Sequence, residues 1–458
     1  MREYWKLLLL GLVVLNPTMG RSQMTELLTL EESISVALHR NFNVKSAEYG
    51  LQQRDAQVMS AYSAILPNVS ISSGRSRFLQ GVTSNIGNVQ GLDENGNITI
   101  VSKEFKSPYF QRDNNSFGMT YRQNIYDGGR WWNNISRAKS YQSASFHRVE
   151  VAKNEAVFNT SQSYLELAKA KAFQYALFDA LMLSQEQLER TESLYELGSV
   201  ARTDFYKAKV QLGNNRSNLL NQQNVVASAK SRLNIIMGRG PLTQFRIEEV
   251  EYPKVEYPSR EEAMETALEN NPLVKQKKAS VDGAEDGKKV ARSAFLPSLT
   301  GYINYNRNNE DLGRVFSPSN ISDNWSSSLG LSMSLNLFNG FADKANLEES
   351  QAIYRSSWED YENTKRNILA TIDNAITRLE TYEELEMIFS DNKESAEEDL
   401  RLATERYELG SATLLEVQDA QVALLRSNTS TIRNKYDYQI AYAQLLNAMG
   451  TIRAGELK

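Results

Sequence analysis

Apolar residues change their spacing along the chain, and the same succession of spacings occurs twice. Over Thr29–Ala64 and Ser259–Ala294, alanine and leucine recur at helical intervals among polar residues, so we expect one helix over each segment. Both segments run into a Leu-Pro pair, at Leu66-Pro67 and Leu296-Pro297. Because proline stops a helix and favours extended backbone in the residue before it, each helix should give way to a strand.

Alternation of apolar and polar residues follows each Leu-Pro pair. It is clearest over Trp325–Leu337, where leucine and methionine alternate with serine, glycine and asparagine. Weaker alternation covers Asn68–Phe78, Phe117–Ile125 and Leu299–Tyr305. Segments of about ten residues with one apolar face are typical of membrane β-barrel strands, although a strand of a soluble sandwich alternates as well.

Two polar segments separate the paired strands. Gln80–Ser107 and Asn306–Asp323 are rich in glycine, asparagine, aspartate and serine, which predicts loops. The offset between the two halves of the chain falls from 230 to 212 residues across this region. The difference in length is therefore confined to the strand and loop segments, while the helices stay in step.

The longest helical patterns cover Arg130–Leu197 and Ala342–Leu409, which contain neither glycine nor proline. At 1.5 Å per residue each would be about 100 Å long, which implies a coiled-coil-like assembly. In the second pattern, apolar residues step by four and three, as in Ile368, Ile372, Ala375, Leu379 and Tyr382. A half-length helix is expected after each long one, over Thr203–Met237 and Leu415–Met449.

One five-residue string marks the turn between the long and short helices in both halves. Tyr195–Ser199 and Tyr407–Ser411 both read YELGS. When the 18-residue segments that begin with this string are aligned, 8 positions are identical. Glycine between two helical patterns adopts the left-handed backbone that ends a helix, which predicts two helical hairpin tips. The chain thus divides into a first repeat over 23–238, a proline-rich linker over 239–258, a second repeat over 259–450 and a tail over 451–458.

The first 22 residues have the order of a secretory signal peptide. Arg2 and Lys6 precede an apolar run from Leu7 to Leu15, and small residues stand before Gln23. The apolar run is shorter than the about 20 residues that a membrane-spanning helix needs. We therefore expect export of the chain and removal of residues 1–22.

Composition excludes several classes of function. The formal net charge of −5 becomes −7 in the mature chain, and no basic stripe is present, which argues against a nucleic-acid partner. Without cysteine there is no disulfide framework and no thiol nucleophile. The two histidines, His39 and His147, lie far apart, and no catalytic triad, phosphate-binding loop or dinucleotide fingerprint occurs. We therefore expect no enzymatic activity, no cofactor and no metal site.

The duplicated order of elements resembles the TolC family of outer membrane efflux proteins. The resemblance covers nearly the whole mature chain: helix, Leu-Pro, two strands, an Asp/Asn-Gly turn (Asp127-Gly128 and Asn339-Gly340), long helix, Tyr-x-x-Gly tip and short helix. It implies a mixed α and β membrane protein, a homotrimer with four strands per protomer in one 12-stranded outer-membrane barrel, in contact with outer membrane lipid. The long helices would continue it as a helical barrel in the periplasm of a diderm bacterium.

The function that the resemblance implies is a passive exit duct for efflux or type I secretion. Its partners would be a periplasmic adaptor (membrane fusion) protein and an inner-membrane transporter that supplies the energy. The exported cargo, whether a drug, a metal ion or a polypeptide, stays open. An alternative is a secreted coiled-coil structural or adhesive protein without a pore, which would explain the long helices but not four amphipathic strands at matched positions.

The resemblance also assigns residues to the periplasmic entrance. Glu416 and Asp419 lie three apart, hence on one helix face, where the family carries acidic residues that ring the constriction. Six carboxylates in a trimer would favour cations, although an ordinary solvated acidic face is the alternative. The first repeat has Asp204 and Lys207 at the matching positions, so only the second repeat is expected to form the ring.

Further positions match family residues that hold the entrance closed or meet the adaptor. Thr203, Asp204 and Tyr407 correspond to closed-state links, while a family arginine is replaced by Ala412, for which Arg202 is a possible substitute. The adaptor-docking tips would be Leu197, Gly198 and Ser199 in the first repeat and Leu409, Gly410 and Ser411 in the second. Glycine in these tips would be needed for the helical turn in any case.

Overall fold

The computed structural model describes residues 26–248, 255–317 and 322–453, so the expected signal peptide over 1–22 lies outside the described residues. The chain divides into two compact units. The first, called the tip unit, contains the chain up to Lys45, Ala152–Ala267 and Leu369 onward; the second, the strand unit, contains Ser46–Val151 and Leu268–Ile368. Two 67-residue helices, α3 (Arg130–Glu196) and α8 (Ala342–Glu408), belong in part to each unit and match the predicted long helices.

The sequence predicts one helix near the N-terminus and one after the linker. In the structure, each of these two segments forms two helices instead. α1 (Leu30–Arg40) is followed by α2 (Phe42–Tyr62), and α5 (Arg260–Asn270) by α6 (Pro272–Arg292). The breaks fall at Asn41 and Asn271, whose backbones are not helical and whose side-chain oxygens each accept a 2.8 Å hydrogen bond from the N–H two residues later. The expectation of single helices was wrong because an asparagine restarts the helix at each place.

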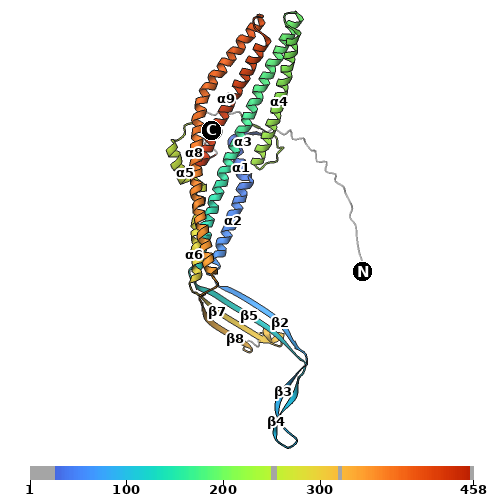
Figure 1. Ribbon diagram of the computed structural model, residues 1–458, viewed down its shortest axis with the longest axis vertical. Coiled ribbons are helices and arrows are strands. Elements are labelled where there is room, and N and C mark those ends of the chain that lie inside the picture. The colour runs from blue at the N-terminus through green and yellow to red at the C-terminus, as the bar shows by residue number, and fades with distance from the viewer. Residues whose placement is uncertain (1–25, 249–254, 318–321, 454–458) are drawn as a thin grey trace, which may run out of the picture. The chain divides into compact units, whose positions relative to one another are not determined.

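The strand unit contains a four-stranded antiparallel sheet in the order β2-β5-β7-β8 (Figure 1). Its strands are β2 (Asn68–Gln80), β5 (Phe110–Asp127), β7 (Ser298–Asn309) and β8 (Trp325–Ser334), which overlap the four predicted strands. β5 and β7 lie far apart in the chain yet pair directly, so the sheet joins the two halves of the sequence. β2 and β8 stand at its edges.

The register of the sheet separates an apolar face from a polar one. Ile71 lies opposite Met119, which lies opposite Tyr305, and Ile303 lies opposite Leu329. Successive residues of a strand point to opposite faces. The residues paired above, together with every second residue along each strand, point to one side of the sheet, which we call the apolar face. Its apolar members are Val69, Ile71, Phe117, Met119, Tyr121, Ile303, Tyr305, Trp325, Leu329, Leu331 and Met333. Its side chains are largely uncovered within one chain, and Leu329 is 81% exposed.

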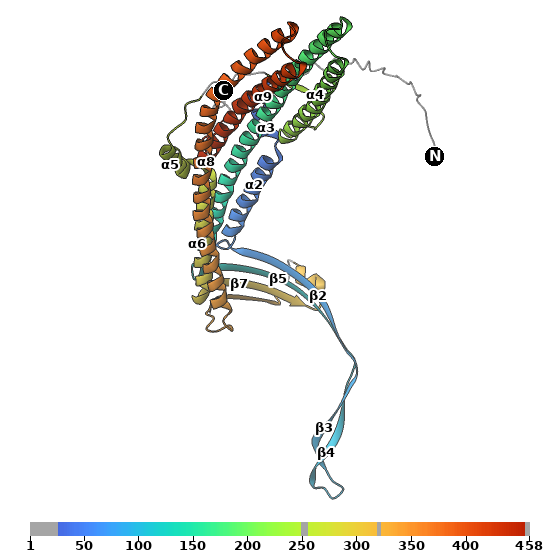
Figure 2. The ribbon, with the colours of Figure 1, turned by 45° about the horizontal axis from the view of Figure 1, so that its top comes forward.

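The first polar segment is not a loop as predicted but a β-hairpin, β3 (Thr83–Leu92) and β4 (Ile98–Ser107), seen beyond β2 and β5 in Figure 2. Its turn is held by Asp93, whose carboxylate accepts hydrogen bonds from the N–H groups of Asn95 and Asn97 at 2.9 and 2.8 Å. Cross-strand pairing stabilises strands whose glycine and asparagine content indicates a loop on local grounds. The second segment carries a short helix, α7 (Leu312–Phe316), whose Phe316 packs on Phe117.

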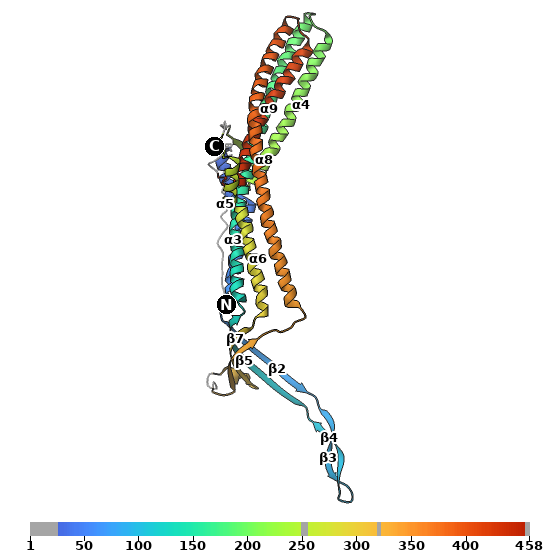
Figure 3. The ribbon, with the colours of Figure 1, turned by 60° about the vertical axis from the view of Figure 1, so that its left-hand side comes forward.

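In the tip unit, each long helix is accompanied by the short helix that follows it in the chain. Figures 1 and 3 show α4 (Arg202–Ile236) beside α3, and α9 (Leu414–Met449) beside α8. The linker contributes β6 (Phe245–Ile247), which pairs in parallel with β1 (Glu26–Leu28). The buried hydroxyl of Tyr164 in α3 donates to the Leu28 or Glu248 carbonyl, at 3.1 and 3.3 Å, and so anchors both segments to the long helix.

Within the described ranges, no helix combines the length and the apolar character that crossing a membrane would require.

Candidate functional site at the hairpin tips

The first tip connects α3 to α4 through a glycine in the left-handed conformation. Gly198 has φ +74°, and its N–H donates to the Tyr195 carbonyl at 2.9 Å, while the Ser199 N–H reaches back to Leu194 at the same distance. This is the hydrogen-bond pattern of a helix that ends on glycine. Leu197, just before the glycine, is 78% exposed and points an apolar side chain out of the tip.

The second tip repeats this geometry between α8 and α9. Gly410 has φ +71°, its N–H donates to Tyr407 at 3.0 Å, and the Ser411 N–H donates to the Arg406 carbonyl at 2.8 Å. Leu409 is 82% exposed. The prediction of two helical hairpin tips is therefore confirmed as local structure, and each tip presents one exposed leucine.

A small core joins the two hairpins just behind their tips. Tyr407 is 5% exposed, and its hydroxyl lies 3.4 Å from the Thr191 hydroxyl of α3. Arg190 of α3 forms a 2.8 Å ion pair with Glu408 of α8. The apolar members of this core are Ala208, Ala403, Tyr407, Leu414, Val417 and Ala420. The Tyr407 side chain is thus engaged between hairpins of one protomer.

Glu416 closes a capping box at the start of α9. Its carboxylate accepts hydrogen bonds from both the N–H and the hydroxyl of Thr413 at 3.1 Å, and the Glu416 N–H donates back to the Thr413 hydroxyl at 3.3 Å. Arg406 adds an ion pair at 3.4 Å. The Thr413 N–H and hydroxyl and the Arg406 charge lower the pKa of Glu416 below its usual value. Its charge is therefore partnered inside the protomer.

Asp419, unlike Glu416, has no partner for its carboxylate among the described residues. It is exposed, lies one turn further into α9, and makes no hydrogen bond or ion pair with any residue that the structure describes. Its neighbours Val417 and Ala420 turn towards the core, so the aspartate lies on the side of α9 away from it. The two carboxylates that the sequence predicts as a pair are chemically unequal: one is a helix cap, the other a free charge.

The first turn of α4 holds the remaining predicted residues. Asp204 forms a 3.7 Å ion pair with Lys207 on the same helix, a stabilising place for an acid near a helix N-terminus. Arg202 donates to the Tyr206 hydroxyl at 3.1 Å and stacks on that ring, so within the protomer it bonds to its own helix. Ala412 packs against the core behind the tips. Thr203, beside Arg202, is exposed.

Sequence reasoning missed Arg406, the arginine that bridges the second tip. Besides pairing with Glu416, its guanidinium donates to the Ser411 carbonyl at 3.1 Å. A signal was present in the sequence: a threonine followed three residues later by glutamate marks a capping box ahead of an apolar run. That local signature is enough to assign Glu416 to the end of a helix.

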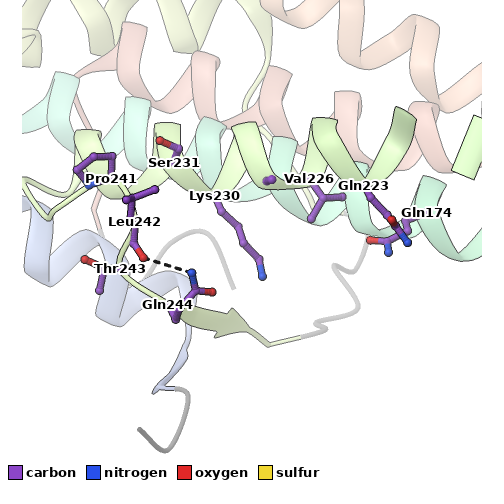
Figure 4. Close-up of a pocket in the computed structure, with 10 residues that line it drawn as sticks. Gln174, Gln223, Val226, Lys230, Ser231, Pro241, Leu242, Thr243 and Gln244 are labelled. Carbon is purple, nitrogen blue, oxygen red and sulfur yellow. Dashed lines mark hydrogen bonds between the residues drawn. The ribbon is translucent and has the colours of Figure 1, made fainter. Parts of the chain in front are cut away.

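A groove elsewhere in the tip unit lies between α4 and the linker (Figure 4). It has a volume of about 360 Å³, and its lining mixes amides, hydroxyls and the ammonium group of Lys230 with the apolar side chains of Val226, Ala227, Pro241 and Leu242. The Asn234 side chain in α4 donates to the carbonyls of Pro241 and Thr243 at 3.3 and 2.9 Å, and these bonds hold the linker against α4. Within the described ranges, no three acidic or histidine side chains come together as metal ligands would.

The profile of the outer membrane efflux protein family matches residues 33–239 and 263–451, which is most of the chain. The chain belongs to this family. The gap between the matched segments falls on the linker, and both tips lie inside them.

Individual relatives agree with this assignment. The outer membrane protein TolC of Vibrio cholerae is 23% identical over 418 residues, which cover 87% of this chain and 86% of the relative. The outer membrane efflux protein BepC of Brucella suis is 20% identical over 454 residues, 99% and 92% of the two chains. The solved structure of the outer membrane protein VceC of Vibrio cholerae has a TM-score of 0.76 at 19% identity and covers 92% of this chain and 96% of that one.

Family membership places the chain in the outer membrane and makes it an efflux channel of the TolC type. The fold agrees, since the solved channels share its combination of long helices and strands. The family is one of channels and not of enzymes. These findings favour the channel over the adhesive coiled-coil alternative.

Proposed function

We propose that three copies of this chain form a passive duct from the periplasm through the outer membrane, with no enzymatic step of its own. The observation that carries the proposal is the four-stranded sheet with two open edges, β2 and β8, and one exposed apolar face. An open edge presents unpaired N–H and C=O groups, which a membrane does not tolerate. Pairing β2 of each copy with β8 of the next would close a 12-stranded barrel and remove every edge.

The size of the apolar face supports this arrangement. On β8 the face runs from Trp325 to Met333, nine residues whose eight steps span about 26 Å of strand at 3.3 Å per residue. The apolar band of an outer-membrane barrel is about 25 Å tall. The opposite face, with Ser70, Thr120 and Asn304, would line a wet lumen.

The hairpin tips would form the periplasmic end of the duct. We assign the exposed Leu197 and Leu409, with the glycine and serine that follow each, to docking of a periplasmic adaptor. Asp419, and Glu416 with its Arg406 partner, would surround the entrance, while Thr203, Asp204 and Tyr407 would hold neighbouring tips together when it is closed. The two halves, 23–238 and 259–450, would act as structural repeats joined by the linker over 239–258.

Energy and choice of cargo would come from an inner-membrane transporter. The wall of the duct would be polar, and whether the cargo is a drug, a metal ion or a polypeptide would be decided by that transporter.

In planar lipid bilayers, the purified protein is expected to form small, cation-selective pores, because carboxylates at a constriction attract cations. Reversal potentials in a salt gradient measure this directly. If replacing Glu416 and Asp419 together by asparagine leaves conductance and selectivity unchanged, these residues do not form the entrance.

Cell fractionation is expected to place the protein in the outer membrane as a trimer that needs detergent for extraction and dissociates on heating. Closed barrels resist dissociation because all their strand edges are paired. A secreted, detergent-independent monomer would contradict the duct and revive the adhesive alternative.

A further inference from the structure

The apolar face of the sheet ends at a row of charged residues. Along the β2–β5 ladder, Ile71 opposite Met119 is followed by Ser73 opposite Phe117, and then by Arg75 opposite Asn115 and Arg77 opposite Asp113. On each strand these residues are two positions apart, so their side chains all point to the same side of the sheet. The charged side chains therefore continue the apolar face and do not belong to the polar face. The change from apolar to charged occurs within two to four residues on one strand.

Two arginines share one carboxylate in this row. Arg77 binds Asp113 with two hydrogen bonds, at 2.6 and 2.9 Å, and Arg75 reaches the same aspartate at 3.3 Å. Asp113 is the one carboxylate that pairs with either arginine among the residues that the structure describes. The cluster therefore keeps a net positive charge, and both arginine side chains are at least half exposed.

An aromatic pair marks the height at which the charges begin. Tyr305 and Trp325 stack at 6.3 Å between ring centroids, and Trp325 lies opposite Arg307 at the outer end of the β7–β8 ladder. Tyrosine and tryptophan gather where the apolar band of a membrane protein meets the headgroups. Arg75 and Arg77 lie just beyond this row along β2, which in the proposed barrel would be the depth of the lipid headgroups.

We propose that Arg75 and Arg77 form a binding site for the phosphate groups of phosphorylated lipid in the outer leaflet of the outer membrane. Arginine presents a planar fork of N–H donors that matches phosphate oxygens, and the Arg75 guanidinium uses few of its donors on Asp113. Asp113 holds the two guanidinium groups side by side, so a phosphate meets preordered donors. The inference rests on the proposed function, in which the apolar face contacts lipid.

Geometry favours lipid over a soluble anion. The cluster lies on the face that also carries Ile71, Met119 and Leu329, so a ligand with a phosphate headgroup and acyl chains can satisfy both the charged row and the apolar residues beneath it. A free phosphate would use only the arginines. The β2 strand is an edge of the sheet, so in a closed barrel the site would lie at the contact between neighbouring copies.

Native mass spectrometry of the detergent-purified full-length protein tests the site, with lipid A carrying both phosphates as the probe and dephosphorylated lipid A as its comparison. Arg75→Gln combined with Arg77→Gln is expected to weaken binding of the phosphorylated probe about 30-fold, given the usual contribution of each arginine at an anionic lipid surface. The dephosphorylated probe should bind the wild type and the variant equally weakly.

Arg112→Gln is the matched control. Arg112 is similarly exposed on the neighbouring strand, but its side chain points to the polar face of the sheet and pairs with Glu310. It should bind the phosphorylated probe like the wild type. Equal binding of the two probes by the wild type, or equal loss in the control and the double variant, would overturn the site. Pore formation in bilayers is recorded on the same samples: a wild type that forms no pores refutes the proposed duct, whereas normal pores with unaltered lipid binding in the double variant refute only the lipid site.

Discussion

Replacing Asp419 by asparagine is expected to lower the ratio of cation to anion permeability about fivefold, since one unit charge near a passing ion in water is worth about 1 kcal/mol. Asp419 is exposed and has no partner among the residues described, so its full charge would act on the proposed entrance. Asparagine keeps the size of the side chain and removes only the charge. Reversal potentials of single channels in a salt gradient measure the ratio, and helical circular dichroism checks the fold.

The control removes the other carboxylate together with its partner. Arg406→Gln combined with Glu416→Gln leaves the net charge of the tip unchanged, and the amide oxygen of the new glutamine in α9 can still accept the capping hydrogen bond from the Thr413 N–H. The selectivity of this double variant should stay near that of the wild type. If its selectivity falls as far as that of the Asp419 variant, the conclusion that Asp419 and Glu416 contribute unequally to selectivity is wrong.

Gly238→Ala is expected to destabilise the protein by about 3–5 kcal/mol, the combined cost of a strained backbone and of overpacking. Gly238 has φ +70°, and a Cβ atom there would lie 2.5 Å from the carbonyl oxygen of Arg40. The contact cannot relax easily, because the Asn41 side chain donates to the Ile236 carbonyl at 2.9 Å and so fixes the end of α4 against the α1–α2 break. The midpoint of thermal unfolding in detergent measures the loss.

Gly213→Ala provides the comparison, inside the helix that ends just before Gly238. Gly213 lies in the interior of α4, and a Cβ atom added there would meet no other group within 4 Å. Alanine favours a helix over glycine by about 1 kcal/mol, so this variant should unfold at a higher temperature. A fall in both variants would show that the glycines matter through helix flexibility and not through the contact with Arg40.

Local patterns were enough to predict most helices and strands. The two 67-residue helices and the helices after the tips begin and end within a few residues of their predicted bounds, because glycine, proline and apolar spacing act on neighbouring residues. The breaks at Asn41 and Asn271 were missed, although Pro272, at the first position of a helix, was a local sign of the second. The hairpin β3–β4 was missed because its stability comes from pairing between strands whose local composition indicates a loop.

Residue patterns along the chain were enough to predict where the helices turn, which residues alternate on the strands, and the family to which the chain is similar. Which of those residues meet depends on the folded chain. Folding buries Tyr407 against Thr191, pairs Arg406 with Glu416, leaves Asp419 without a partner among the described residues, and gathers Arg75 and Arg77 on Asp113. Helical turns form from bonds between residues four apart, whereas the charge that a carboxylate shows to its surroundings depends on groups that folding brings close.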